Sequence, residues 1–174
     1  TRFTEMKKNF FWFFLTWNLS ALWVYLSYVA GMVAVTSKHS SELTIVEYTF
    51  CFFGFLVWLA GFIIEVASDN QKKKFKEDIS NKDKFISHGL WAWSRHPNYF
   101  GEILLWIGIT IIAIPIFKNW DYLALISPIF IYYLLVNISG IPMLEKAADK
   151  KWGNNEDYIS YKDKTNILFL KKPD

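Results

Sequence analysis

Four long runs of apolar residues, separated by polar stretches, dominate the pattern along this 174-residue chain. They cover residues 10–35, 45–67, 98–117 and 122–144. A helix needs about 20 apolar residues to cross the hydrocarbon core of a bilayer, and weak alternation favours helices over barrel strands. The pattern predicts an all-α integral membrane bundle of four transmembrane helices. A soluble all-helical domain with a very apolar core is the alternative.

The polar stretches set the domain organisation. Residues 68–97 form a connecting loop, residues 145–174 form a tail, and no internal repeat divides the chain. We therefore predict a single transmembrane domain over residues 1–174. The composition agrees with a membrane protein, because 53% of the residues are hydrophobic and 20% are aromatic.

Charge placement predicts the orientation. If the four helices alternate in direction, the N-terminus, the loop 68–97 and the tail share one side of the membrane. That side holds all of the 19 Lys and Arg residues except Lys38 and Lys118. The positive-inside rule places this basic side, and both termini, in the cytosol or the mitochondrial matrix. We expect the endoplasmic reticulum or the mitochondrial inner membrane in a eukaryote, and the inner membrane in a bacterium.

The densest polar chemistry lies in the stretch Trp93–Glu102, directly before the third apolar run. Polar groups at such a junction are costly to desolvate, so they serve either a binding site or a structural network. Pro97 disfavours a helical conformation at His96 and suits the first turn of a helix. A helix start beside Arg95 could bind a phosphate or carboxylate. A satisfied polar cluster between helices is the alternative.

Two further groups precede this stretch. Glu65 and Asp69 are four residues apart, so their like charges repel unless a partner offers donors. They form either solvated helix-end charge, a structural link to Arg95, or contacts to a ligand. The run 72–76 is typical of a juxtamembrane anchor that meets anionic lipid headgroups, and Lys76 is its best candidate for a ligand phosphate.

The end of the fourth run contains Gly140 and Pro142, which predict a kink or a break that lines a cavity. The tail that follows is polar and aromatic. It could cap a pocket on the basic side, or lie on the membrane surface as an amphipathic helix.

A family resemblance joins these pieces. Gly89-Leu90-Trp91 followed by Ser94–Glu102 resembles the signature of the steroid 5-alpha-reductase C-terminal domain family, above all its uncharacterised membrane branch. That branch is related to sterol reductases and isoprenylcysteine carboxyl methyltransferases. The resemblance covers nearly the whole chain, because three further blocks match in order: Ile64–Asp69, Ser139–Lys146, and Glu156–Tyr158 with Ile167–Phe169.

The resemblance implies a bundle of about seven spans whose C-terminal half, corresponding to this chain, binds NADPH near the cytosolic face. It implies NADPH-dependent reduction of a C=C bond in a sterol or other lipid. The N-terminal spans that handle the substrate in the reductases have no counterpart in this sequence, so the catalytic residues stay unknown, and no metal site is predicted. The implied cofactor-binding residues are Glu65, Asp69, Lys76, Arg95, His96, Asn98, Tyr99, Glu102, Glu145 and Tyr158.

Two other functions stay open. The chain could be a non-catalytic, structural or accessory subunit of a larger membrane complex. It could also be an S-adenosylmethionine-dependent methyltransferase, since that related family shares the Arg95-His96-Pro97 step. The continuation Asn98–Glu102 favours the reductases. Expected partners are membrane lipids and, for the accessory role, other subunits; nucleic acid is not an expected partner.

Overall fold

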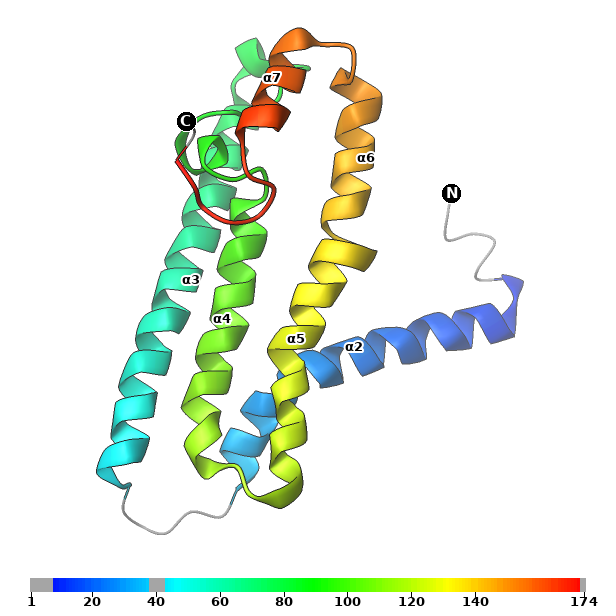
Figure 1. The fold of residues 1–174 in the computed structure, drawn as a ribbon. Helices are drawn as coiled ribbons and strands as arrows, with labels where there is room; N and C mark the ends of the chain where they lie inside the picture. Colours follow the sequence, from blue (N-terminus) through cyan, green and yellow to red (C-terminus); the bar gives the residue numbers. More distant parts are fainter. Residues whose placement is uncertain (1–7, 38–42, 173–174) are drawn as a thin grey trace.

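The computed structural model describes residues 8–37 and 43–172, and every regular element within them is helical (Figure 1). Four helical stretches are long and apolar enough to cross a membrane. The predicted all-α membrane fold is therefore confirmed. The stretches are α2 (Phe10–Thr36), α3 (Ile45–Glu77), α4 (Pro97–Ala113) with its 3₁₀ extension η3 (Ile114–Ile116), and a composite stretch Asn119–Trp152.

Helix α2 joins the other helices through its C-terminal half only (Figure 1). Asn9 caps its start, because the side-chain oxygen accepts the N–H groups of Phe11 and Trp12 at 3.0 and 3.4 Å. The buried residues of this long helix are Ser27 and Ala30. An apolar helix with so few buried side chains is typical of a surface that faces lipid.

Helices α3 and α4 form the closest packed pair in the fold. Glycines meet at two levels, Gly61 with Gly101 and Gly54 with Gly108. A Cβ atom added at Gly101 would lie 2.7 Å from the amide nitrogen of Glu65 and 2.7 Å from the carbonyl oxygen of Gly61. Glycine permits this approach of two backbones, as in small-residue contacts between membrane helices.

The fourth apolar stretch is interrupted. The break predicted from Gly140 and Pro142 is confirmed, because a π-helical turn and Ser139 precede a new helix that begins at Ile141. Short π-helical turns change the direction of a helix and often occur near functional sites. In order, the stretch consists of the 3₁₀ helix η4 (Asn119–Leu125), α5 (Ile126–Tyr133), the π-helix η5 (Leu134–Ile138) and α6 (Ile141–Trp152).

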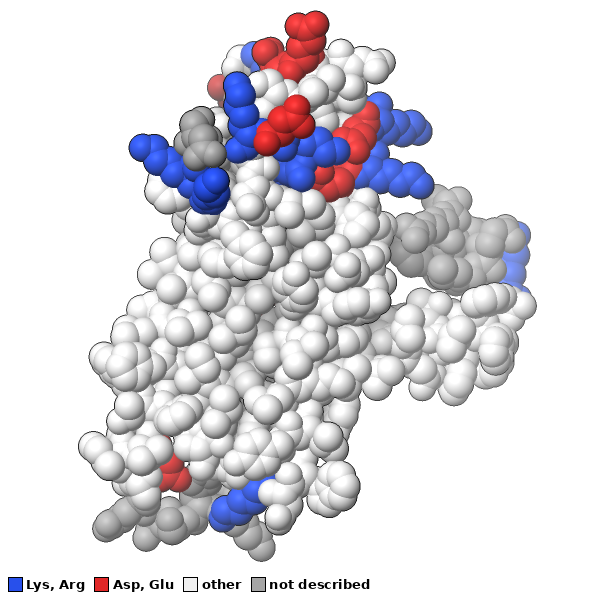
Figure 2. All heavy atoms as spheres, in the orientation of Figure 1, with Lys and Arg blue, Asp and Glu red and all other residues white. Residues whose placement is uncertain are grey.

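One end of the bundle gathers most of the charged side chains, whereas the sides of the long helices are nearly free of charge (Figure 2). Helix α3 continues to Glu77, so the first part of the stretch 68–97 is helical. This charge distribution agrees with the predicted sharing of one side by the loop 68–97 and the tail. The start of α2 lies apart from this end (Figure 1), and residues 1–7 lie outside the described part of the chain. The short elements at this end are η1 (Ile79–Asn81), η2 (Gly89–Ala92) and α7 (Glu156–Lys164).

An apolar core lies directly beneath the charged end. It joins α4, α5, η5, α6 and the segment after α7, and thereby fixes the positions of the helix ends above it. Its buried members are Ile103, Ile131, Leu135, Ile141 and Leu168.

Candidate functional site

The segment after α7 holds the Arg95–His96 step in place. The buried Ser94 hydroxyl donates to the carbonyl oxygen of Leu168 at 2.8 Å and accepts the backbone N–H of His96 at 3.1 Å. The backbone N–H of Arg95 donates to the carbonyl oxygen of Asn166 at 2.8 Å. Helix α4 then begins at Pro97, as predicted, with His96 in a non-helical conformation. The side chains of Arg95 and His96 therefore project from a hydrogen-bonded helix start.

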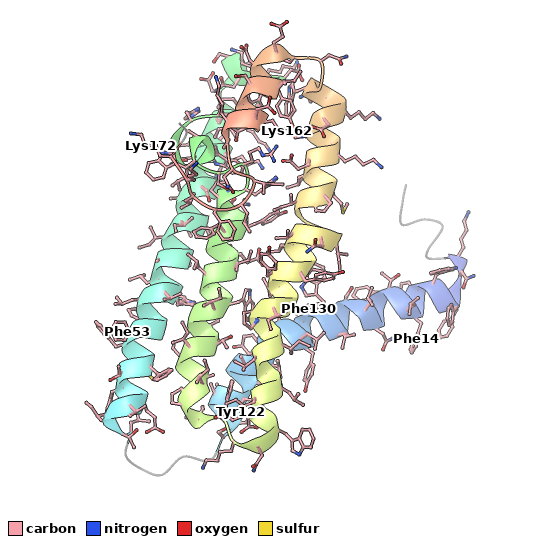
Figure 3. The ribbon with its side chains drawn as sticks, viewed as in Figure 1. Phe14, Phe53, Tyr122, Phe130, Lys162 and Lys172 are labelled. Atoms are coloured by element: carbon pink, nitrogen blue, oxygen red, sulfur yellow. The ribbon has the colours of Figure 1, made fainter. Side chains whose placement is uncertain are left out.

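Glu145 on α6 receives three positive or polar groups from other elements. Its Oε2 lies 2.9 Å from Nη1 of Arg95, and its Oε1 lies 2.8 Å from Nε2 of His96. Lys162 of α7 lies 3.6 Å from the same carboxylate and 2.6 Å from Asp149 (Figure 3). The carboxylate thus links the start of α4 with α6 and α7. Such a partly buried link is stabilising only while both charges are present.

Three buried nitrogen atoms of this step lack a hydrogen-bond partner within the described residues. They are Nε and Nη1 of Arg95 and Nδ1 of His96. Nη1 is close enough to Glu145 for an ion pair, but its geometry does not meet that of a hydrogen bond. A buried polar group left without a partner costs about 1–3 kcal/mol, more when it is charged. The arrangement therefore suits a polar ligand that supplies acceptors for Arg95 and a hydrogen-bond partner for Nδ1 of His96.

Arg95 and His96 line a cavity of about 470 Å³ at the charged end. The cavity is within the size range of about 300–1,000 Å³ typical of sites for small molecules and cofactors. Its walls come from the end of α3, the loop 81–86, the start of α4, α6 and α7, and they carry Arg95 with several lysines. These cations outnumber the two carboxylates of the lining, Asp83 and Glu145, and leave the cavity with a net positive charge; the lysines are Lys72, Lys76, Lys82, Lys84 and Lys151.

Aromatic rings form one wall of the cavity. The ring centroid of Phe85 lies 5.9 Å from Trp152, 5.3 Å from Tyr158 and 5.4 Å from Tyr161. Burial, with a hydrogen bond of 3.1 Å to Asp149, raises the pKa of Tyr158 to about 12. Its hydroxyl is therefore protonated at physiological pH. Tyr158 and Tyr161 of the tail line the cavity, in agreement with the prediction that the tail could cap a pocket on the basic side.

Trp91 is the buried support behind the cavity. Its indole N–H donates to the carbonyl oxygen of Ser68 at 2.9 Å, and its carbonyl oxygen accepts the hydroxyl of Tyr161 at 2.7 Å. Burial raises the pKa of Tyr161, so this hydroxyl stays a donor. The ammonium of Lys72 lies 4.5 Å from the centre of the Trp91 ring, a cation–π contact. Trp91 thus connects α3 to α7.

Three of the predicted acidic residues form a different group. Glu65 and Asp69 of α3 and Glu102 of α4 lie close enough for their charges to interact, and none of them lines the cavity. Asp69 instead lines a separate, open hollow on α3, which shares Lys72 and Lys76 with the cavity.

Of the ten predicted cofactor-binding residues, the cavity gathers five: Lys76, Arg95, His96, Glu145 and Tyr158. Tyr99 lies between this set and the acidic group, because its ring stacks on His96 with centroids 5.7 Å apart. Asn98 is half-buried in the first turn of α4. Sequence reasoning missed Phe85, Asp149 and Lys162. Phe85 could have been found, because it is an aromatic residue in the polar loop before the Arg95–His96 step. The pairing of Asp149 with Lys162 could not, because it depends on how α7 folds back on α6.

Comparison with known proteins places this chain in a family. The family model described as a protein of unknown function, DUF1295, matches residues 1–165. The chain belongs to the DUF1295 family. This family consists of steroid 5-alpha-reductase-like proteins, so the resemblance predicted from the motifs is confirmed.

Curated relatives of this DUF1295 protein match over short stretches. The mouse 3-oxo-5-alpha-steroid 4-dehydrogenase 1 is 32% identical over 62 residues, which is 35% of this chain and 24% of the relative. Its counterpart from Macaca fascicularis is 36% identical over 55 residues, 32% of this chain and 21% of the relative. The probable O-methyltransferase ustE of Ustilaginoidea virens is 28% identical over 101 residues, 53% of this chain and 35% of the relative.

The matches therefore span about a fifth to a third of the length of these relatives. No solved structure gives a significant match. The chain is an integral membrane protein of a reductase-like or methyltransferase-like family.

Proposed function

We propose that this chain forms the cofactor-binding part of a membrane reductase that uses NADPH to reduce a C=C bond in a sterol or other lipid. The observation that carries the proposal is the set of buried nitrogen atoms of Arg95 and His96 that lack a hydrogen-bond partner among the described residues, on side chains that line a cavity rich in lysines. The similarity to 3-oxo-5-alpha-steroid 4-dehydrogenases also supports a reductase.

The residues of the cavity fit this cofactor. The pyrophosphate and the 2′-phosphate of NADPH are acceptors that suit a guanidinium and several ammonium groups. The aromatic wall around Phe85 offers faces on which flat rings can stack. Arg95, His96 and Lys76 would hold the anionic part, and NADPH supplies the hydride when it is bound. Glu145 would keep Arg95 and His96 oriented through their contacts of 2.9 and 2.8 Å.

A methyltransferase is the second candidate, because the match to a probable O-methyltransferase covers the larger share of this chain. S-adenosylmethionine carries a sulfonium cation and no phosphate. The positive charge of the cavity therefore favours NADPH over S-adenosylmethionine. An accessory subunit is the third candidate; in that case, the cavity would serve only as a structural polar network.

NADPH fluorescence titration of the chain in lipid nanodiscs tests the assignment. We expect Arg95→Gln to weaken NADPH binding about tenfold to hundredfold, since a hydrogen bond to a charged group contributes about 1.5–3 kcal/mol. Lys76→Gln should also weaken it, with little change in stability, because Lys76 is exposed. Lys118→Gln, between α4 and α5 at the opposite end, is the matched control and should leave binding unchanged.

The outcomes separate the candidates. Unchanged NADPH affinity in both Arg95→Gln and Lys76→Gln would remove the assignment of this cavity. Tighter binding of S-adenosylmethionine than of NADPH would favour the methyltransferase. Binding of neither would favour the accessory subunit. With NADPH bound, loss of a C=C bond from a sterol or enoyl lipid then tests the reaction itself.

A further inference from the structure

The segment after α7 presents apolar side chains outward from the edge of the bundle. Leu168 is buried in the core, while Ile167 and Phe169 on either side of it are 40% and 58% exposed. The side-chain oxygen of Asn166 fixes this alternation, because it accepts the backbone N–H groups of Leu168 and Phe169 at 3.1 and 3.0 Å. The outward position of Phe169 is therefore built into the fold.

These side chains lie at the level where the third span begins. The ring of Phe169 packs edge-on against Phe100 at 5.9 Å, and Phe100 is in the first turn of α4. Trp93, 45% exposed, is held beside this segment because its carbonyl oxygen accepts the backbone N–H of Lys171 at 3.1 Å. Aromatic rings at the start of a span are characteristic of the boundary between lipid tails and headgroups.

Lysines stand on both sides of the apolar part of this segment. Between Lys164 and Lys172 the sequence contains no Asp or Glu. The side chain of Lys172 points away from the helices in Figure 3. A hollow of about 330 Å³ beside the segment is lined by Asp163, Lys164, Thr165, Asn166 and Lys171, so two ammonium groups and one carboxylate border it.

We propose that Trp93, Ile167 and Phe169, together with Lys164 and Lys172, form a docking surface for the headgroups of anionic phospholipids. The rings enter the headgroup boundary of the leaflet, and the lysines contact the lipid phosphates. Two observations favour anionic lipids as the occupant. The lysines complement the negative phosphates, and the contact of Phe169 with Phe100 places its ring at the start of the third span. A lysine near an anionic leaflet strengthens binding about fivefold. The proposal is independent of the cofactor and of the reaction.

The single cysteine allows a local test on the full chain. In a Cys51→Ser background, a fluorescent label at Phe169→Cys reports contact with nitroxide-labelled lipids in vesicles. We expect stronger quenching by nitroxide-labelled phosphatidylglycerol than by the phosphatidylcholine analogue. A label at Asp157→Cys, on the exposed first turn of α7, is the matched control and should be quenched by aqueous iodide only.

Charge removal tests the headgroup contact. Lys164→Gln with Lys172→Gln should lower the preference for phosphatidylglycerol at the probe about fivefold or more. Lys146→Gln with Lys150→Gln removes the same charge from α6 and should leave the preference intact. Equal quenching by both lipids would overturn the proposal. A probe reached only by iodide would place the surface in water, and one shielded from both quenchers would indicate a protein partner; either result would also overturn it.

Discussion

Adding one methyl group at Gly101 should separate the two helices that carry the site. In Gly101→Ala the new Cβ would meet the carbonyl oxygen of Gly61 at 2.7 Å and the amide nitrogen of Glu65 at 2.7 Å. Both are backbone atoms, so no side chain can rotate to relieve the contact. Helices α3 and α4 must move apart, and the contacts of Glu65 and Glu102 beside them change as well.

The expected size of the effect follows from two opposing contributions. Overpacking a close contact costs about 1–3 kcal/mol, and rigid backbone atoms place this case in the upper half of that range. Alanine in place of glycine in a helix contributes about 1 kcal/mol in the favourable direction. We therefore expect a net loss of about 1–2 kcal/mol. For a domain of this size, the melting temperature should fall by about 2–8 °C.

Gly31 provides the matched control within the same bundle. A Cβ atom at Gly31 would lie 3.6 Å from the nearest atom, on Ile109, which is an ordinary contact. Gly31→Ala should therefore stabilise the protein by about 1 kcal/mol. Thermal unfolding of the purified chain in detergent, followed by circular dichroism, measures both variants. Equal melting temperatures for the two variants would refute the close approach of α3 and α4.

Two further predictions concern the polar site. Tyr158→Phe removes the hydrogen bond to Asp149 and should cost about 1 kcal/mol at neutral pH. Because the folded-state pKa of about 12 lies above the ordinary value of 10.0, this advantage is complete below pH 10.0 and falls as pH rises to about 12. Chemical unfolding of the unsubstituted protein and of Tyr158→Phe between pH 10.0 and about 12 measures this difference. A difference in unfolding free energy that stays constant over this range would contradict the prediction. Glu145→Gln leaves Arg95, whose side chain is 12% exposed, without its ion-pair partner. The substitution should lower the free energy of unfolding by about 3 kcal/mol, which chemical unfolding measures. A loss of only about 1 kcal/mol or less, as for an exposed ion pair, would show that solvent screens the two charges.

Much of the fold could be predicted from local pattern. The apolar runs located the four spans, Pro97 located the start of α4, and Gly140 with Pro142 located the break in the fourth span. Each of these depends on neighbouring residues in the chain, through hydrophobic length or backbone restriction. The continuation of α3 to Glu77 was not predicted, because polar residues hide the end of a helix once it leaves the membrane.

The site could be predicted only in part. The family motifs pointed to Arg95, His96, Glu145 and Tyr158, which the structure brings to one cavity. The same motifs pointed to Asp69, which lines a different hollow on α3. Asp69 lies one turn before Lys72 on the same face of α3, so the position of the cavity along the helix decides this difference, and no local pattern records it.

By itself, the sequence of this protein determined how many helices are long enough to cross a membrane and which end of them is basic. Those properties follow from the transfer free energy of each side chain and add up along the chain. The tertiary structure decided that Glu145 meets Arg95 and His96, which lie far from it in the sequence. Electrostatic contacts depend on separation and burial, and here the glycine contacts between α3 and α4 and the break before α6 set both.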